Sequence, residues 1–382
     1  MSADGMKRER DKFFVPERIL QEQTSEIASP RGRLLVASCR AGSYLAANVV
    51  AHYRDHLREQ GSEAPVLYLE DIDRQFSDSE SCVGLDIHVG GYDVFLFQGF
   101  AHHAAASGVD QAYMAFLIAA RTFREHGAKH VTAVLPYLAY GRQDKPTRFQ
   151  REPTTLKLMA DLALEAGIDR LVTWQPHSRQ MHGFYGRVRV DLLESLKLFV
   201  DEFRRFEGRE DVVAVAPDPG ASKFVSYFAR ALDLNSAVAA KYRPEPEKAV
   251  ISEVIGDLSG KRVAVVLDDM ISSGGTVYAL ITKLVKETEI GEIYLGASHY
   301  LGIDGAGERL MELYEEYGLK QLVVTNSIPL TKHFEEMPFV RVKCLADTFA
   351  RIINRIHYDR SVSELFYPWQ VDPEEPGCTG GL

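Results

Sequence analysis

The feature that most constrains the fold is an alternation of short β-branched runs with longer helix-type patterns along most of the chain. Strands are expected at 33–38, 64–69, 93–98 and 130–136, and again at 211–217, 236–240, 262–269, 292–300 and 321–326. Helices are expected at 43–59, 111–126, 153–166, 220–232, 275–287 and 306–317. Such an alternation builds βαβ units, so it predicts a doubly wound α/β fold with largely parallel sheets.

The pattern divides the chain into two similar α/β halves. The stretch "GFYGRVRV" interrupts it near residues 185–195, and 382 residues at roughly 150 per domain fit two or three domains. We expect an N-terminal domain at 32–188 and a C-terminal domain at 189–345, followed by a C-terminal helix at 346–367. Residues 1–31 and 368–382 are polar and marked by Pro and Gly, so a mobile extension and a mobile tail are expected.

Charge and cysteine content exclude several classes of protein. The formal net charge of -10 disfavours nonspecific binding of nucleic acid and favours a small-molecule ligand. Cys39, Cys82, Cys344 and Cys378 form no CxxC pair, which fits a reducing cytoplasm. The N-terminal charged run lacks a following apolar stretch, and no segment offers about 20 apolar residues, so neither export nor a membrane partner is expected.

One strand is expected to end in a turn suited to phosphate, in the stretch "VVLDDMISSGGTVYAL" at residues 265–280. Glycines allow close backbone approach, while hydroxyls and the free N–H groups of the next helix can donate to an anion. The two preceding carboxylates would repel a bare phosphate and therefore call for ligand hydroxyls or a metal, as a sugar phosphate offers. The alternative is a glycine turn that only starts a helix. The residues concerned are Asp268, Asp269, Ser272, Ser273, Gly274, Gly275 and Thr276.

This stretch closely resembles the 5-phosphoribosyl 1-diphosphate binding motif of the phosphoribosyltransferase superfamily. Further stretches resemble the ribose-phosphate diphosphokinase family, and the resemblance runs from about Gly32 to Tyr367: "QFSDSE", "LPYLAYGRQDKPTRFQREPTTLKLMADL", "HSRQMHGFYG", "VVTNSIPL" and "ADTFARIINRIHYDRSVSELF". The resemblance implies two phosphoribosyltransferase-like domains. It also implies transfer of the β,γ-diphosphoryl group of ATP to the C1 hydroxyl of ribose 5-phosphate.

The resemblance places ATP on two polar segments. In "FSDSE", Phe76 is expected to stack on adenine, with the carboxylates of Asp78 and Glu80 near the edge of the base. In "GRQDK", the residues expected to contact ATP are Arg142, Gln143 and Asp144, of which the arginine can pair with phosphate. Taken alone, "FSDSE" is better explained as a surface turn with one half-buried aromatic, and "GRQDK" also fits an exposed polar loop.

Two further residues are expected to bind magnesium. His177 matches the family's motif histidine, which contacts the ATP phosphates and Mg²⁺, and an imidazole is suited to either contact. Asp218 matches the family's metal-binding aspartate and follows another strand. A structural histidine and an aspartate that starts the next helix are the alternative interpretations.

The stretch "VAAKYRPEPEKA" matches the family's flexible catalytic loop. In an extended segment, Lys241 and Arg243 would face one side and clamp the transferring group, while Tyr242 points away. Pro244 and Pro246 are expected to discourage regular structure, as a mobile lid requires. A solvated loop with ordinary charges is the alternative.

Several positions depart from the family pattern. Gln175 stands where an acidic residue is usual, Ser272 replaces a common aspartate, and the segment 107–117 matches only in part. Two other hypotheses therefore stay open, a noncatalytic regulatory paralogue that binds nucleotides and a phosphoribosyltransferase. The resemblance also implies a homo-oligomer built from dimers, extending to hexamers.

Overall fold

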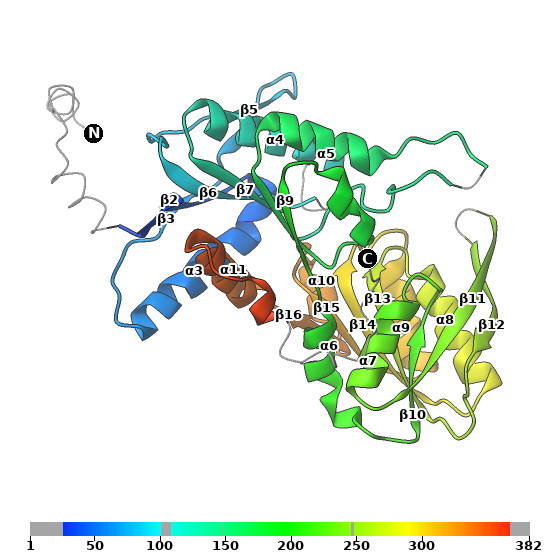
Figure 1. The fold of residues 1–382 in the computed structure, drawn as a ribbon. Coiled ribbons are helices and arrows are strands. Elements are labelled where there is room, and N and C mark those ends of the chain that lie inside the picture. Colours follow the sequence, from blue (N-terminus) through cyan, green and yellow to red (C-terminus); the bar gives the residue numbers. More distant parts are fainter. Residues whose placement is uncertain (1–25, 101–107, 148, 246–247, 367–382) are drawn as a thin grey trace, which may run out of the picture.

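The computed structural model describes residues 26–100, 108–147, 149–245 and 248–366, without the side chains of residues 241–250. Two α/β domains, each built around its own sheet, follow one another along the chain (Figure 1). The α/β class expected from the alternation is confirmed. The predicted mobile tail at 368–382 and most of the predicted extension at 1–31 lie outside the described residues.

The first domain has a seven-stranded sheet in which only β1 is antiparallel to its neighbour. The order is β1-β2-β6-β7-β8-β9, and β3 also pairs with β2. The strands are β1 (Ala28–Ser29), β2 (Gly32–Ser38), β3 (Leu67–Leu69), β6 (Tyr92–Phe97), β7 (His130–Val134), β8 (Arg170–Trp174) and β9 (Arg189–Leu193). Its helices are α3 (Ser43–Glu59), α4 (Val109–Glu125) and α5 (Thr155–Ala166).

The second domain has another seven-stranded sheet, in the order β12-β11-β10-β13-β14-β15-β16, with β12 antiparallel at one edge. The strands are β10 (Val212–Ala216), β11 (Asn235–Glu245), β12 (Lys248–Ile255), β13 (Val263–Ile271), β14 (Glu292–Tyr300), β15 (Leu319–Thr325) and β16 (Val340–Lys343). The helices are α6 (Leu196–Phe203), α7 (Ser222–Ala231), α8 (Gly275–Glu287), α9 (Ala306–Glu316), α10 (Lys332–Glu335) and α11 (Ala346–His357).

Both faces of each sheet are covered, which explains why the central strands are largely apolar. In β2, Leu35 packs toward the side of α4 and α5, whereas Leu34 packs toward α3 and α11. The second sheet is arranged likewise, with α8 and α9 on one face and α6 and α7 on the other. Parallel sheets of this kind are buried on both faces, so the strands lack a polar side.

The first domain takes up more of the chain than residues 32–188. β9 lies beyond the expected boundary but pairs with β8, so the first sheet extends to Leu193. α11 packs on α3 and completes the first domain's second core, although it comes last among the helices (Figure 1). This helix ends at His357 rather than near 367, because Asp359 adopts a left-handed φ of 51° that breaks the helical path.

Two hairpins project from these layers. A small one joins β4 (Asp73–Gln75) to β5 (Ser81–Val83). The other joins β11 to β12, and it contradicts the expectation that the prolines prevent regular structure. β11 continues through Pro244, where the pairing with β12 is irregular and a residue without an N–H group is tolerated. Pro246 lies outside the described residues.

A buried ionic cluster holds the C-terminal helix on the first domain. Arg31 donates twice to Asp93, from Nε and from Nη2, each at 3.0 Å. His357 Nδ1 lies 2.9 Å from Asp93 Oδ2, and both of these side chains are fully buried. Asp93 therefore ties β6 to the segment before β2 and to the last turn of α11.

We predict that Asp93→Asn lowers the free energy of unfolding of the first domain by about 3–5 kcal/mol, because it leaves the buried Arg31 guanidinium with only the half-exposed Asp359, 3.9 Å away, as a counter-charge. Urea unfolding followed by the fluorescence of the buried Trp174 reports this domain once Trp369, the second of the two tryptophans, is replaced by Phe. Asp55→Asn is the matched control, since the Arg58–Asp55 pair is exposed and worth at most about 1 kcal/mol. Equal losses in the two variants would contradict the assigned role of Asp93.

Candidate active site

The candidate site lies where carboxyl ends of strands from the two domains meet. His177 follows β8 of the first sheet, and its Nδ1 lies 2.6 Å from Oδ2 of Asp269, near the end of β13 in the second sheet. Beside this contact, His299 at the end of β14 places Nε2 at 3.0 Å from the carbonyl oxygen of Gln175. Strand ends that were predicted separately thus form one junction between the domains.

The loop after β13 has the geometry expected of an anion cradle. Gly274 has φ 75° and ψ -3°, a left-handed conformation that strains residues with a Cβ, and α8 begins at the next residue. Arg309 Nη1 donates to the Ser273 carbonyl at 2.6 Å, and the Ser272 carbonyl accepts from the N–H group of Ile303 at 3.3 Å. The carbonyls of Ser272 and Ser273 thus accept hydrogen bonds from the protein itself. The N–H groups of Ser273 and Gly274 have no recorded partner among the described residues.

The two aspartates before this loop have pKa values shifted in opposite directions. Burial, reinforced by the charge of Asp269, raises the pKa of Asp268 well above its usual range. Burial also acts to raise the pKa of Asp269, but the hydrogen bond and the charge of His177 outweigh it and lower that pKa. The surroundings therefore favour the protonated form of Asp268 and the ionised form of Asp269.

His177 is positioned by its aspartate and leaves one ring nitrogen open. The hydrogen bond to Asp269 raises the pKa of His177, and the charges of Asp144 and Arg142 act on the ring as well. The "GRQDK" loop therefore lies near His177, with Asp144 buried and Arg142 exposed. The His177 side chain is 42% exposed, and no partner is recorded for its Nε2 within the described residues.

Asp218 serves the following turn and also lies close to the aspartate pair. Its Oδ1 accepts from the N–H groups of Gly220 at 2.9 Å and Ala221 at 3.3 Å. Its charge also helps to raise the pKa of Asp268. The turn interpretation and the site interpretation of Asp218 are therefore compatible.

The remaining predicted residues are not joined to this junction. Phe76, Asp78 and Glu80 form the exposed turn of the β4–β5 hairpin, where the N–H group of Phe76 donates to the carbonyl of Glu80 at 2.9 Å. Among the described residues, no recorded contact joins them to His177 or Asp269. The backbone of Gln143 links its loop to α5 by accepting from Leu156 N–H at 3.1 Å. Lys241 and Arg243 lie on β11, and their side chains are not among those that the structure describes.

Magnesium would need ligand oxygens beyond those of the protein. Within the described part of the chain, no three His, Cys, Asp or Glu side chains are arranged to hold a metal ion. Mg²⁺ bound with a nucleotide usually takes one or two protein carboxylates and completes its shell with phosphates and water. Asp218 fits that requirement because no partner is recorded for its Oδ2, and the open Nε2 of His177 lies at the same junction.

Sequence reasoning missed three residues that shape the junction. They are Tyr137, His299 and Arg309. The rings of Tyr137 and His299 meet edge to face with their centroids 5.0 Å apart, and Arg309 on α9 supports the β13–α8 loop. The available signal was position, because Tyr137 and His299 stand at carboxyl ends of strands that neighbour predicted site strands.

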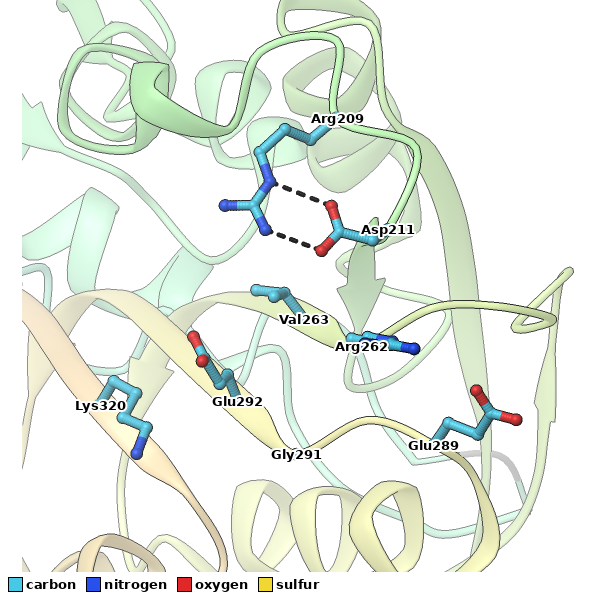
Figure 2. Close-up of a pocket in the computed structure, with 8 residues that line it drawn as sticks. All are labelled: Arg209, Asp211, Arg262, Val263, Glu289, Gly291, Glu292 and Lys320. Carbon is cyan, nitrogen blue, oxygen red and sulfur yellow. Dashed lines mark hydrogen bonds and ion pairs between the residues drawn. The ribbon is translucent and has the colours of Figure 1, made fainter.

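A separate cavity of about 610 Å³ lies at the opposite, amino-terminal ends of β10, β13, β14 and β15 (Figure 2). Arg209 and Asp211 form a two-point ion pair across its rim at 3.0 and 2.7 Å. It holds none of the predicted site residues and is lined by Arg209, Asp211, Arg262, Val263, Glu289, Gly291, Glu292 and Lys320. Its walls carry charges of both signs.

Two models of protein families match the chain. The N-terminal domain of ribose phosphate pyrophosphokinase matches residues 34–167, and a phosphoribosyl synthetase-associated domain matches residues 241–367. Ribose-phosphate pyrophosphokinase of Mycoplasma pneumoniae is 35% identical over 292 residues, which is 76% of this chain and 86% of that protein. The protein of the same name from Hyphomonas neptunium is 33% identical over 330 residues, covering 86% of this chain and 98% of the relative.

A solved structure agrees with these matches. The crystal structure of phosphoribosylpyrophosphate synthetase from Mycobacterium smegmatis superimposes with a TM-score of 0.69 at 29% identity. The match covers 85% of this chain and 98% of that chain. The family resemblance and the two-domain fold expected from the motifs are thereby confirmed.

We predict that Asp269→Asn lowers the pKa of the His177 ring toward the ordinary 6.5, because the carboxylate that stabilises the imidazolium is lost. In the wild type the raised value means that this contact contributes its full stability below about pH 6.5 and loses it as the pH rises through the folded-state pKa. Ring ¹⁵N NMR titration measures the shift, with His177→Gln assigning the signal. Asp268→Asn is the control, and an identical shift in the two variants would contradict the assignment.

Proposed function

This chain belongs to the ribose-phosphate pyrophosphokinase family, and on that premise we propose that it transfers the diphosphoryl group of Mg-ATP to the C1 hydroxyl of ribose 5-phosphate. The products are 5-phosphoribosyl 1-diphosphate and AMP. The observation that carries the proposal is the His177–Asp269 contact. It puts a residue of the nucleotide side and a residue of the sugar side within one hydrogen bond across the domain junction.

Ribose 5-phosphate fits the β13–α8 loop. The 5-phosphate would accept hydrogen bonds from the N–H groups of residues 273–276 and from the hydroxyls of Ser272, Ser273 and Thr276. Asp269, whose pKa is lowered, would accept from ring hydroxyls, while the raised pKa of Asp268 reduces the repulsion between its carboxyl group and the ligand. Gly274 and Gly275 allow the phosphate to approach the backbone.

ATP would lie on the first-domain side of the junction. Arg142 would pair with its phosphates, with Gln143 and Asp144 adding polar contacts from the same loop. The half-exposed ring of Phe76 offers a stacking surface for adenine, and the carboxylates of Asp78 and Glu80 can accept from the exocyclic amine. Asp218 and His177 would hold Mg²⁺ together with phosphate oxygens, and the ion would supply neutralisation of the polyphosphate charge.

In the transfer step the C1 hydroxyl oxygen attacks the β-phosphorus and releases its proton to water. The bond between the β-phosphorus and the oxygen bridging it to the α-phosphate breaks, and that oxygen leaves with AMP. Lys241 and Arg243 would donate to the diphosphoryl oxygens as charge spreads over them, and Nε2 of His177 would donate to the same group in place of holding Mg²⁺. The protein's contribution is therefore mainly positioning and neutralisation of charge.

Two other functions were open from the sequence. A noncatalytic regulatory paralogue would bind ATP without turnover, and a phosphoribosyltransferase would consume 5-phosphoribosyl 1-diphosphate with a nucleobase. The His177–Asp269 contact favours the diphosphokinase, since it keeps two residues of the proposed machinery in mutual contact. The matched family domains also cover both halves of the chain, which a phosphoribosyltransferase does not require.

We further propose that the protein acts as a homo-oligomer built from dimers, up to hexamers, in the cytoplasm, without nucleic acid or membrane partners. Free thiols at Cys39, Cys82 and Cys344 are compatible with a reducing compartment. None of the helices in the described ranges is long and apolar enough to cross a bilayer.

Purified protein incubated with Mg-ATP and ribose 5-phosphate is expected to release AMP and 5-phosphoribosyl 1-diphosphate in equal amounts, quantified by ion-exchange chromatography. Omission of Mg²⁺ is expected to abolish both products, because the polyphosphate charge is then not neutralised. Nucleotide binding without either product would establish the regulatory alternative. Loss of added 5-phosphoribosyl 1-diphosphate only with a nucleobase would establish the transferase.

Lys241→Ala is expected to raise the barrier by about 3 kcal/mol, on the order of 100- to 1,000-fold in kcat, because one aimed donor to the transferring group is lost. Steady-state kinetics with both substrates varied measure the effect. Lys248→Ala on the partner strand β12 is the matched control and should leave kcat unchanged. Equal losses in both variants would refute a specific role for Lys241.

A further inference from the structure

A buried polar network crosses the domain junction directly behind the His177–Asp269 contact. Its members are Gln175 and Ser195 from the segments around β8 and β9, and Ser298, His299, Thr325 and Ser327 from the ends of β14 and β15. All except Gln175 are at most 1% exposed. A buried network with its hydrogen bonds satisfied is rigid and specifies one arrangement of the segments it joins.

Gln175 is the first-domain end of this network and is held at four points. Its backbone has a φ of 39°, a conformation that is costly for a residue with a Cβ. Its N–H group donates to Leu193 O at 2.8 Å, and its Oε1 accepts from both N and Oγ of Ser195 at 2.9 Å. Its carbonyl accepts from His299. Strain of this kind persists only where the surroundings hold the residue in place.

His299 is the second-domain end, and its hydrogen bonds determine its tautomer. A carbonyl oxygen can only accept, so Nε2 carries the hydrogen that it donates to Gln175 O at 3.0 Å. Burial lowers the pKa of His299 and so favours a neutral ring, whose Nδ1 can accept from the Ser327 hydroxyl at 2.7 Å; this contact is shorter than the alternative one from the same hydroxyl to the Ser298 carbonyl at 3.2 Å. Tyr44 on α3 in turn donates to the Ser327 carbonyl at 2.8 Å, which adds a second link to the first domain.

The network and the His177–Asp269 contact join the same two segments. His177 follows Gln175 after a single proline, whose fixed φ transmits the position of Gln175 to the histidine. On the other side His299 lies beside Met270, the residue after Asp269, in the β13–β14 register. Two hydrogen bonds, His177–Asp269 and His299–Gln175, therefore connect residues 175–177 with neighbouring strand ends of the second sheet.

We propose that His299 is a positioning residue for the transfer reaction, which holds Gln175 in its strained conformation and thereby keeps His177 against Asp269. The proposal rests on the proposed function, because the benefit is correct placement of the nucleotide side relative to the sugar side. His299 itself touches no substrate in this arrangement. Its effect passes through the Gln175 carbonyl, and Ser195, Ser298 and Ser327 maintain the geometry of that bond.

His299→Ala is the primary test and is expected to lower kcat by about 10- to 100-fold, the usual effect of losing a residue that orients a ligand-contacting group. KM for ribose 5-phosphate should stay unchanged, because the β13–α8 loop is supported separately by Arg309. His299→Gln should restore most of the turnover. Its amide nitrogen lies as many bonds from Cα as the ring Nε2 and can donate to the same carbonyl.

The matched control is Thr173→Val, which lies two residues before Gln175. Thr173 Oγ1 is buried and has no hydrogen-bond partner in the described structure, so its loss removes a buried hydroxyl from the same strand without touching the network. This variant should keep wild-type kcat. Should His299→Ala fail to fold, Ser327→Ala tests the same point, since it removes the donor to Nδ1 and should lower kcat in the same direction.

Crystal structures of the wild type and of His299→Ala provide a readout that does not depend on turnover. The proposal expects Gln175 to relax to a negative φ and His177 to leave Asp269 in the variant. Retention of the His177–Asp269 contact, or an equal loss of kcat in Thr173→Val, overturns it. A wild type that binds both substrates but forms no product refutes the proposed function, and the comparison of structures still decides the positioning role.

Discussion

Negative charge is crowded at the facing edges of the two sheets, and the rest of the site is organised around that crowding. Asp144, Asp218, Asp268 and Asp269 all lie near the junction that a polyphosphate and a sugar phosphate are proposed to share. The protein reduces this crowding before any ligand arrives, because burial raises the pKa of Asp268 and so favours its neutral form, and because His177 pairs with Asp269. Further neutralisation has to come from cations that enter with the substrate or from the basic residues of β11.

Much of the fold could be predicted because both sheets are parallel and buried on both faces. That arrangement requires apolar strands separated by amphipathic helices, so helices at 43–59 and 275–287 and the strand at 292–300 were placed at their observed limits. Short elements, such as the eight-residue α6 and the four-residue edge strand β16, left no comparable signal. The pairing of β9 with the first sheet, and of α11 with α3, depends on contacts distant in sequence that a local pattern does not encode.

Candidate site residues that directly follow strands could be predicted from the sequence. Residues that act through their backbone could not. The β13–α8 loop was identified from its glycines, hydroxyls and carboxylates at a strand end, whereas His177 and Asp218 were identified from the family resemblance; all of them follow strands, at the edge where the carboxyl ends of parallel strands converge. Gln175 was noticed only as a departure from the family pattern, and its contribution is a carbonyl and a strained φ that no residue type specifies. The "FSDSE" turn is the opposite case, in which the sequence signal is clear but the structural link is missing from the described residues. Its motif is clear, yet no described contact joins it to the junction.

Two kinds of contact hold the domains together, and they do different things. Ile328, from the second domain's "VVTNSIPL" stretch, packs into the first domain's core, which brings the domains together through a contact with little directional preference. Hydrogen bonds depend on angle as well as distance, so the network of Gln175, Ser195, Ser298 and His299 fixes how the domains are turned relative to each other. The contact that brings the domains together is thus different from the contacts that set their relative orientation. A reaction that depends on aiming a hydroxyl at a phosphorus atom is more sensitive to alignment than to association.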